Sequence, residues 1–471
     1  MKKILLSIGL LGGMVYSQTV QDINSVSAFS NDLNAGSARY IGMGGAMGAL
    51  GGDISSIEQN PAGLALAITT EGSATLGVTS YKNKASFGSA VSVNDNDFMF
   101  TNIGGAFVFN NEAIAWNRFS IGVKYSQESL DNHLRMDRNN QISMSLSDID
   151  DPELITNYTF AGYQDQVVGY KTKMTLDFGA SYNDRLYLGL GLNLHDTQFN
   201  NYVVFDEDTN GTVYRYDLNG TPYSSRGSGV SVSVGAIGKV NDNFRLGLAY
   251  HSPAWYGQVE EEYLADLPIT DSTSYFDWYY SQYDRTSNGR LVGSAGLVLG
   301  KSFALNVDYT YHMNGSTELR PSGNFQNINY FLDEYLKNNS ELRVGGEYRL
   351  NKFKIRAGYN YVQTPFDDVS LSADLGTGNP VSQDFSQAFR GDINRFSFGA
   401  GYDFGGFYLD AAYQFQTQDY NYVFGYADYI DYDVNDDFVY YATLPLYSDY
   451  NYVADVKENK GMFLLTAGWQ F

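Results

Sequence analysis

Apolar and polar residues alternate along most of the chain after Leu66, which is the pattern of β-strands with one apolar face. The clearest stretch is 185–195. One of its faces carries Leu186, Leu188, Leu190, Leu192 and Leu194, and the other carries Tyr187, Gly189, Gly191, Asn193 and His195. One such strand would also suit a soluble sandwich. The repetition of the pattern is therefore the informative observation.

The alternation predicts fourteen strands, at 70–81, 98–110, 118–126, 172–183, 185–200, 226–240, 243–255, 290–300, 302–312, 339–350, 352–362, 392–404, 407–418 and 459–471. Lengths of about 9–15 residues fit tilted strands that cross a membrane and exceed the usual length in soluble sheets. Short turns alternate with long connections at about 82–97, 127–171, 201–225, 256–289, 313–338, 363–391 and 419–458. This regularity favours an outer-membrane barrel over a sandwich with Greek-key crossings.

The amino-terminal region does not follow the strand pattern. Met1-Lys2-Lys3, an apolar run over 4–15 and the small residue Ser17 are typical of a secretory signal peptide. The run is shorter than the roughly 20 residues of a spanning helix. We therefore divide the chain into a signal peptide (1–17), an N-terminal hatch or plug (18–67) and a barrel (68–471).

The stretch 36–64 is rich in glycine and nearly free of charge, and it fits neither an amphipathic helix nor an alternating strand. Gly42, Gly44 and Gly45 predict close backbone packing in a confined space. Asn60-Pro61-Ala62 ends the stretch, since Pro61 disfavours helix at the residue before it. A dinucleotide-binding fingerprint is excluded, because Met47 occupies its last glycine position and no buried strand precedes it.

Charged residues in the predicted strands keep to one face, which must be the lumen. Arg or Lys facing lipid at mid-bilayer costs about 2–4 kcal/mol. The lumen network that we predict consists of Arg343, Glu347, Arg349, Lys354 and Arg356. A two-residue turn at 351–352 would set Glu347 opposite Arg356, and Arg349 opposite the like-charged Lys354. We expect a hatch carboxylate, Asp53 or Glu58, to neutralise the second pair, either to anchor the hatch or beside a contact for an acidic ligand headgroup.

Composition supports a sheet in a membrane. The 471 residues include 40 Tyr, 29 Phe and 49 Gly but only 9 Pro and no Cys, which suits strands, tight turns and interfacial aromatic belts. The net charge of −23 argues against a nucleic-acid partner. The four histidines at unrelated spacings predict no metal site and no hydrolase. We expect neither enzymatic activity nor a cofactor.

Aromatic residues in the long connections are candidate ligand contacts. They include Tyr275, Phe276, Trp278, Tyr426 and Tyr429. A hydrophobic ligand needs an apolar receiving surface. The alternative interpretation is that these loops pack on each other or that the aromatic residues belong to the interfacial girdle.

Three stretches resemble the FadL/TodX family of outer-membrane transporters for long-chain fatty acids and other hydrophobic compounds. They are GMGGAMGALGGDISSIEQNPAGL, AIGKVNDNFRLGLAYHSP and ELRVGGEYRLNKFKIRAGYNYVQTPF. The resemblance implies an all-β fold, a fourteen-stranded antiparallel transmembrane barrel whose lumen is filled by the hatch. It also implies passive transport, in which ligand binds near the outer surface, the hatch shifts, and ligand leaves sideways through a wall defect around the third strand. Here that strand has Gly122 but no proline.

The same resemblance sets the expected location and partners. We expect a monomer in the bacterial outer membrane, in contact with lipid and lipopolysaccharide, that takes a hydrophobic small molecule as ligand. The terminal Phe471 resembles the signal read by the barrel-assembly machinery. A barrel adaptor that binds secreted protein cargo, as in type IX secretion, is the alternative function, and a haem receptor is a weaker one.

Overall fold

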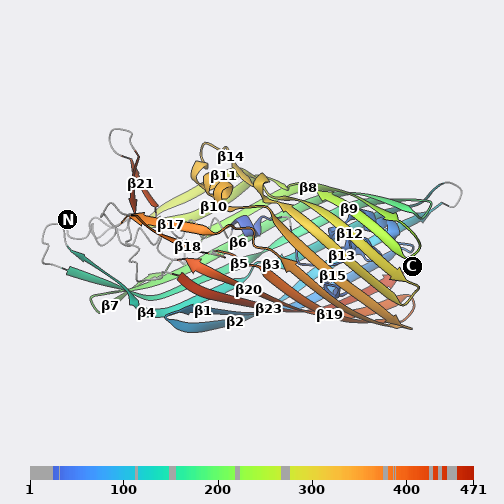
Figure 1. Ribbon diagram of the computed structural model, residues 1–471, viewed down its shortest axis with the longest axis horizontal. Coiled ribbons are helices and arrows are strands. Elements are labelled where there is room, and N and C mark those ends of the chain that lie inside the picture. Colours follow the sequence, from blue (N-terminus) through green and yellow to red (C-terminus); the bar gives the residue numbers. More distant parts are fainter. Residues whose placement is uncertain are drawn as a thin grey trace.

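The fourteen predicted strands form the wall of a closed antiparallel barrel (Figure 1). The computed structural model describes residues 25–30, 32–111, 115–147, 155–217, 223–266, 276–374, 380–385, 387, 389–423, 428–432, 438–442 and 453–471, so the predicted signal peptide lies outside the described residues. In order, the wall strands are β1 (Glu71–Phe87), β2 (Ser89–Asn110), β3 (Trp116–Ser129), β5 (Ile155–Tyr182), β6 (Leu186–Thr209), β8 (Tyr223–Lys239), β9 (Phe244–His251), β12 (Gly289–Leu299), β13 (Phe303–Met313), β15 (Asn339–Leu350), β16 (Phe353–Val362), β19 (Ile393–Asp403), β20 (Phe407–Val423) and β23 (Val453–Gln470). Pairing of β1 with β23 closes the circle.

The two faces of the wall differ as the alternation predicts. In β6, Leu190 points outward and is 53% exposed, whereas Asn193 points inward and is 2% exposed. Outward positions of the neighbouring strands carry further exposed apolar side chains, such as Phe178 and Val234. The outer surface is therefore apolar, and the buried charged side chains lie in the lumen.

Much of the sequence between the predicted strands is also β-structure, so several predicted long loops are wrong. The connection predicted at 82–97 is a continuation of the β1–β2 hairpin, which turns at Gly88. Further elements lie at the same end of the barrel as this hairpin turn. They are β4 (Asn132–Ser147), β7 (Thr212–Asp217), β10 (Trp255–Asp266), β11 (Phe276–Thr286), η3 (Asn314–Ser316), β14 (Glu318–Arg320), α3 (Gln326–Tyr335), β17 (Val369–Asp374), β18 (Pro380–Phe385), β21 (Asp428–Tyr432) and β22 (Phe438–Ala442). The other end has tight turns, for example at Asn351, whose φ is 56°.

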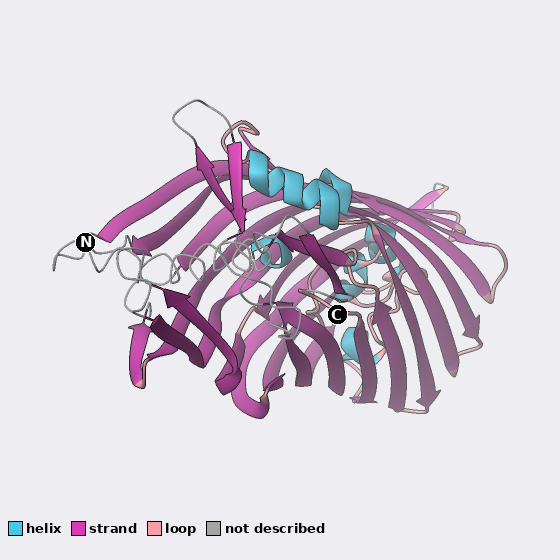
Figure 2. Ribbon diagram, turned by 60° about the vertical axis from the view of Figure 1, so that its left-hand side comes forward, coloured by secondary structure: helices cyan, strands magenta, loops and turns pink. Residues whose placement is uncertain are grey.

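Residues 32–66, which we call the inner segment, lie inside the barrel (Figure 2). They form α2 (Ala38–Gly42), η1 (Ile54–Glu58) and η2 (Pro61–Leu66). Each begins at a side-chain cap, since Ser37, Asp53 and Asn60 accept hydrogen bonds from the backbone amides of Tyr40, Ser55 and Ala62. No helix among the described residues is long and apolar enough to span a bilayer.

The ladder between the second and third wall strands is incomplete. It runs from the pair Asn110 and Arg118 to the pair Asn102 and Ser126 and then stops. Beyond that point β2 continues paired with β1, and the chain after β3 continues as β4, which pairs with β5. Side chains of β4 pack against the inner faces of β1 and β20. Beyond Asn102, β2 therefore has no ladder partner on its β3 side among the described strands.

Candidate functional site

The inner segment contacts the wall at glycine residues of the wall strands, which have no side chain. A Cβ atom added at Gly358 would lie 2.2 Å from the backbone nitrogen of Gly44, and one at Gly189 would lie 2.2 Å from that of Ala62. Gly44 itself has φ of +64°, and its own Cβ would meet the backbone of Tyr359 at 3.0 Å. Gly42 likewise approaches Gly399 of β19. The backbones of segment and wall are thus in direct contact.

The remaining residues of the predicted hatch motif also lie at this contact. Gly45 has φ of +74° and packs beside Tyr40 and Arg343. The side-chain Nδ2 of Asn60 donates to the backbone oxygen of Ala236 in β8 at 3.3 Å, and Pro61 packs against Gly189.

Glu347 in the predicted lumen network joins the wall to the inner segment. The register sets Glu347 opposite Arg356 and Arg349 opposite Lys354, as the two-residue turn predicts. Arg356 donates to Glu347 at 2.7 Å, and Arg39 of α2 donates to it at 2.9 Å. Because both arginines converge on one buried carboxylate, this contact holds α2 against the wall.

The expected role of Asp53 or Glu58 beside Arg349 and Lys354 is wrong. Lys354 lies 3.4 Å from Asp403, and Arg349 lies 3.4 Å from Glu347. Wall carboxylates therefore neutralise both groups, and Asp53 caps η1 instead.

Glu58 lies in a different ion-pair cluster. It accepts from Lys124 of β3 and Lys173 of β5 at 2.6 Å each, and Arg290 of β12 lies 3.5 Å away. Glu58, Lys124 and Lys173 are all buried. A buried charge is tolerated only when it is paired and hydrogen-bonded. This cluster therefore depends on the position of η1.

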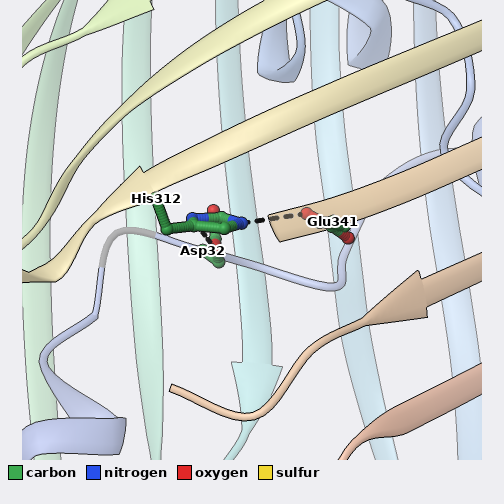
Figure 3. A group of neighbouring side chains, drawn as sticks. All are labelled: Asp32, His312 and Glu341. Carbon is green, nitrogen blue, oxygen red and sulfur yellow. Dashed lines mark hydrogen bonds and ion pairs between the residues drawn. The ribbon is translucent and has the colours of Figure 1, made fainter. Parts of the chain in front are cut away.

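Asp32, His312 and Glu341 form a third polar cluster (Figure 3). The His312 ring lies between the two carboxylates, with Nδ1 3.1 Å from Asp32 and Nε2 3.3 Å from Glu341. Arg290 also pairs with Asp32, and Arg343 pairs with Glu341 at 2.7 Å. A metal ion would have to compete with these two guanidinium groups. The arrangement is better described as an ionic clamp between the inner segment and β13 and β15.

An apolar cluster surrounds the stretch 25–30 at the end of the barrel with the longer connections. Phe29 is fully buried there and meets the Tyr256 ring edge-on, with centroids 4.9 Å apart. The other buried members are Ala28, Phe199, Tyr223, Ala254, Val259, Tyr283, Leu319, Leu332, Leu336 and Phe366. Most belong to β6, β8, β10, β11, β14 and α3. Phe29 therefore occupies an apolar site built mainly by the wall and its extensions.

A cavity of about 230 Å³ lies between this cluster and the inner segment. Its apolar lining includes Leu336 and Phe366, and its basic lining includes Lys171, Arg285 and Arg395. Arg285 stacks over the Phe29 ring at 5.0 Å and donates to the Ser25 hydroxyl at 2.7 Å. The lining also includes the carboxylates of Asp32, Glu128 and Glu341, so the cavity combines apolar side chains with charged groups of both signs.

The predicted loop aromatics contribute no described side chain to this site. Tyr275 and Tyr426 lie outside the described residues. Phe276 and Trp278 lie on β11, and Tyr429 lies on β21. Sequence reasoning missed Phe29 and Arg285, because neither has a periodic pattern or motif that separates it from its neighbours.

The chain shares its fold with solved hydrophobic-compound channels. A FadL homologue of Pseudomonas aeruginosa is 15% identical with a TM-score of 0.55, covering 93% of this chain and 99% of that one. The Pseudomonas putida toluene transporter TodX is 12% identical with a TM-score of 0.55 and the same coverage. The monoaromatic hydrocarbon channel CymD is 11% identical with a TM-score of 0.52, covering 94% and 99%. No family model and no curated protein matches the sequence.

Proposed function

We propose that the protein is a passive transporter of hydrophobic small molecules in the bacterial outer membrane. The observation that carries the proposal is the buried apolar cluster, in which the chain's own Phe29 occupies an otherwise wall-built site. The toluene transporter and hydrocarbon channel with the same fold support this class of ligand. The apolar outer surface supports insertion in lipid, with lipopolysaccharide as a neighbour.

The ligand that we propose is an amphiphile with an anionic headgroup, such as a long-chain fatty acid. Its tail would take the place of Phe29 in the apolar cluster. Its carboxylate would face Arg285 and Lys171, which line the same cavity. Since the N-terminal stretch and the ligand would compete for one site, binding would release residues 25–30 and bias the inner segment toward a second arrangement.

The inner segment would then act as the hatch, and the incomplete β2–β3 ladder would be the exit. An exit to the side needs a place where the wall can open without loss of backbone hydrogen bonds. The ladder already ends at Asn102 and Ser126. Beyond the end of this ladder β4 lies beside β1, and the Asn83 side chain of β1 donates to the His133 backbone oxygen of β4 at 2.9 Å. A cargo adaptor has less support, since the inner segment fills the lumen.

Two measurements test the proposal. Mass spectrometry of the purified barrel should find copurifying fatty acids or other hydrophobic compounds. Liposomes that contain the barrel should take up fluorescent fatty acid faster than liposomes that contain a general porin. If no ligand copurifies and uptake is no faster than with the porin, the transport proposal is contradicted. Specific retention of secreted proteins would favour the adaptor.

A further inference from the structure

Asp177 is a buried carboxylate of the wall that has no hydrogen-bond partner among the described residues. It lies on the lumen side of β5 and is 0% exposed. Within the part of the chain that the structure describes, neither of its oxygens has a hydrogen-bond partner. Leaving a carboxylate unpaired in a buried place is unfavourable, so a second state in which Asp177 is paired would explain its presence.

Asp177 lies between two glycines of the neighbouring strands. The register sets Gly122 of β3 on one side of it and Gly191 of β6 on the other. Its Oδ1 now lies above Gly191, where an added Cβ atom would be 2.1 Å away. Leu64 and Ile54 of the inner segment occupy the space above Gly122, where an added Cβ atom would lie 3.0 Å from Leu64. Rotation about the side-chain bonds of Asp177 can therefore bring the carboxylate toward β3 once the inner segment moves away.

One lysine, Lys124, is near enough to pair with it. Lys124 lies opposite Thr175, so it is a diagonal neighbour of both Lys173 and Asp177. Diagonal neighbours in an antiparallel sheet are about 7–8 Å apart, within reach of a long side chain. Lys124, Lys173 and Glu58 are the charged groups that act electrostatically on Asp177. Both lysines now donate to Glu58 of the inner segment.

We propose that Asp177 is the acceptor that receives Lys124 when Glu58 moves away. This inference rests on the proposed movement of the inner segment as a hatch. Without a second acceptor, that movement would leave the buried Lys124 ammonium group unpaired. With Asp177, Lys124 exchanges one carboxylate for another, and both arrangements of the hatch keep its charge paired. Asp177 is thus a positioning residue for the displaced state.

The first test is structural and does not depend on transport. In a crystal structure of Glu58→Gln, we expect the Lys124 ammonium within hydrogen-bond distance of Asp177. In a double-mutant cycle, Glu58→Gln together with Asp177→Asn should shift the unfolding equilibrium by about tenfold more than the two single changes combined. The proposal is overturned if Asp177 has no lysine partner in the Glu58→Gln structure and the two substitutions have additive effects on the unfolding equilibrium.

The second test measures hatch movement. Because the chain has no cysteine, Ser56→Cys in η1, which is fully buried, can report movement by thiol labelling in liposomes with oleate as the ligand. Asp177→Asn should slow labelling about tenfold. Asp165→Asn is the matched control. It removes another buried carboxylate from β5, one bonded to Asn201 and Tyr422, and should leave the rate unchanged.

The outcomes separate the two proposals. If the parent protein labels and takes up oleate but Asp177→Asn labels equally fast, the inference fails and the transport function stands. If oleate causes no labelling of the parent protein, the hatch movement fails, and the inference fails with it.

Discussion

Phe29 and Phe199 are both buried in the apolar cluster but belong to different parts of the proposed mechanism. Phe29 comes from the N-terminal stretch and fills the site, whereas Phe199 comes from β6 and lines it. We expect Phe29→Ala to raise oleate affinity, because the ligand no longer displaces a competing ring. Phe199→Ala should lower affinity, because the site loses contact area. Each change should cost about 3–5 kcal/mol of stability.

Calorimetric titration of oleate into the detergent-solubilised barrel measures this difference. Both variants replace a buried Phe of the same cluster by Ala, so each serves as the control of the other. Equal loss of affinity in both would mean that Phe29 is a structural part of the binding site rather than its occupant.

At the residue scale, the sequence predicts which face of a strand a charge occupies but not its partner. Two-residue periodicity puts Glu347 and Arg356 in the lumen, and the turn at Asn351 fixes their register. Neither a periodicity nor a short turn relates positions of the inner segment to positions of the wall strands. Glu58 meets Lys124 and Lys173 across 66 and 115 residues of sequence. For this reason its predicted partners were wrong.

At the element scale, η2 is positioned by a wall glycine. A Cβ atom at Gly189 would overlap the backbone of Pro61 and Ala62 at 2.2 Å, which no side-chain motion can relieve. We expect Gly189→Ala to displace η2 and to increase amide hydrogen exchange over 60–66. Gly293→Ala on β12 is the control, because nothing lies within 4 Å of its added Cβ. Unchanged exchange in Gly189→Ala would show that the contact does not hold the segment.

The extended hairpin β1–β2 shows why strand ends were harder to predict than strand centres. The stretch Asn94-Asp95-Asn96-Asp97 is polar at every position, so it has no alternation and resembles a loop. In the structure it is paired with β1, with Tyr81 opposite Asp95. Backbone pairing needs no apolar face where both faces of the strand meet water, and the periodic signal is lost there although the strand continues.

At the scale of the whole molecule, the apolar outer surface predicts where charge is tolerated. Leu190 lies near the start of β6 and is 53% exposed, and Val213 lies on β7 and is 54% exposed. If the barrel spans a bilayer, Leu190→Arg should cost about 2–4 kcal/mol, and Val213→Arg, beyond the lipid, about 0–1 kcal/mol. Reversible urea unfolding in lipid vesicles measures both. Equal costs would argue against the bilayer at the level of Leu190.

The incomplete ladder predicts where ligand leaves the barrel. Between β16 and β19 the pairing is continuous from Phe353 and Tyr402 to Val362 and Ile393, so passage there would break a row of backbone hydrogen bonds. Beyond the pair Asn102 and Ser126, the described residues of β2 and β3 form no ladder, so no such row has to break. A photoreactive long-chain fatty acid in liposomes should therefore label peptides of β2 and β4 on irradiation, whereas β16 and β19 serve as the unlabelled reference. Labelling of β16 and β19 at equal yield would contradict a lateral exit at this place, because the probe would then be reporting the surrounding lipid rather than a path through the wall.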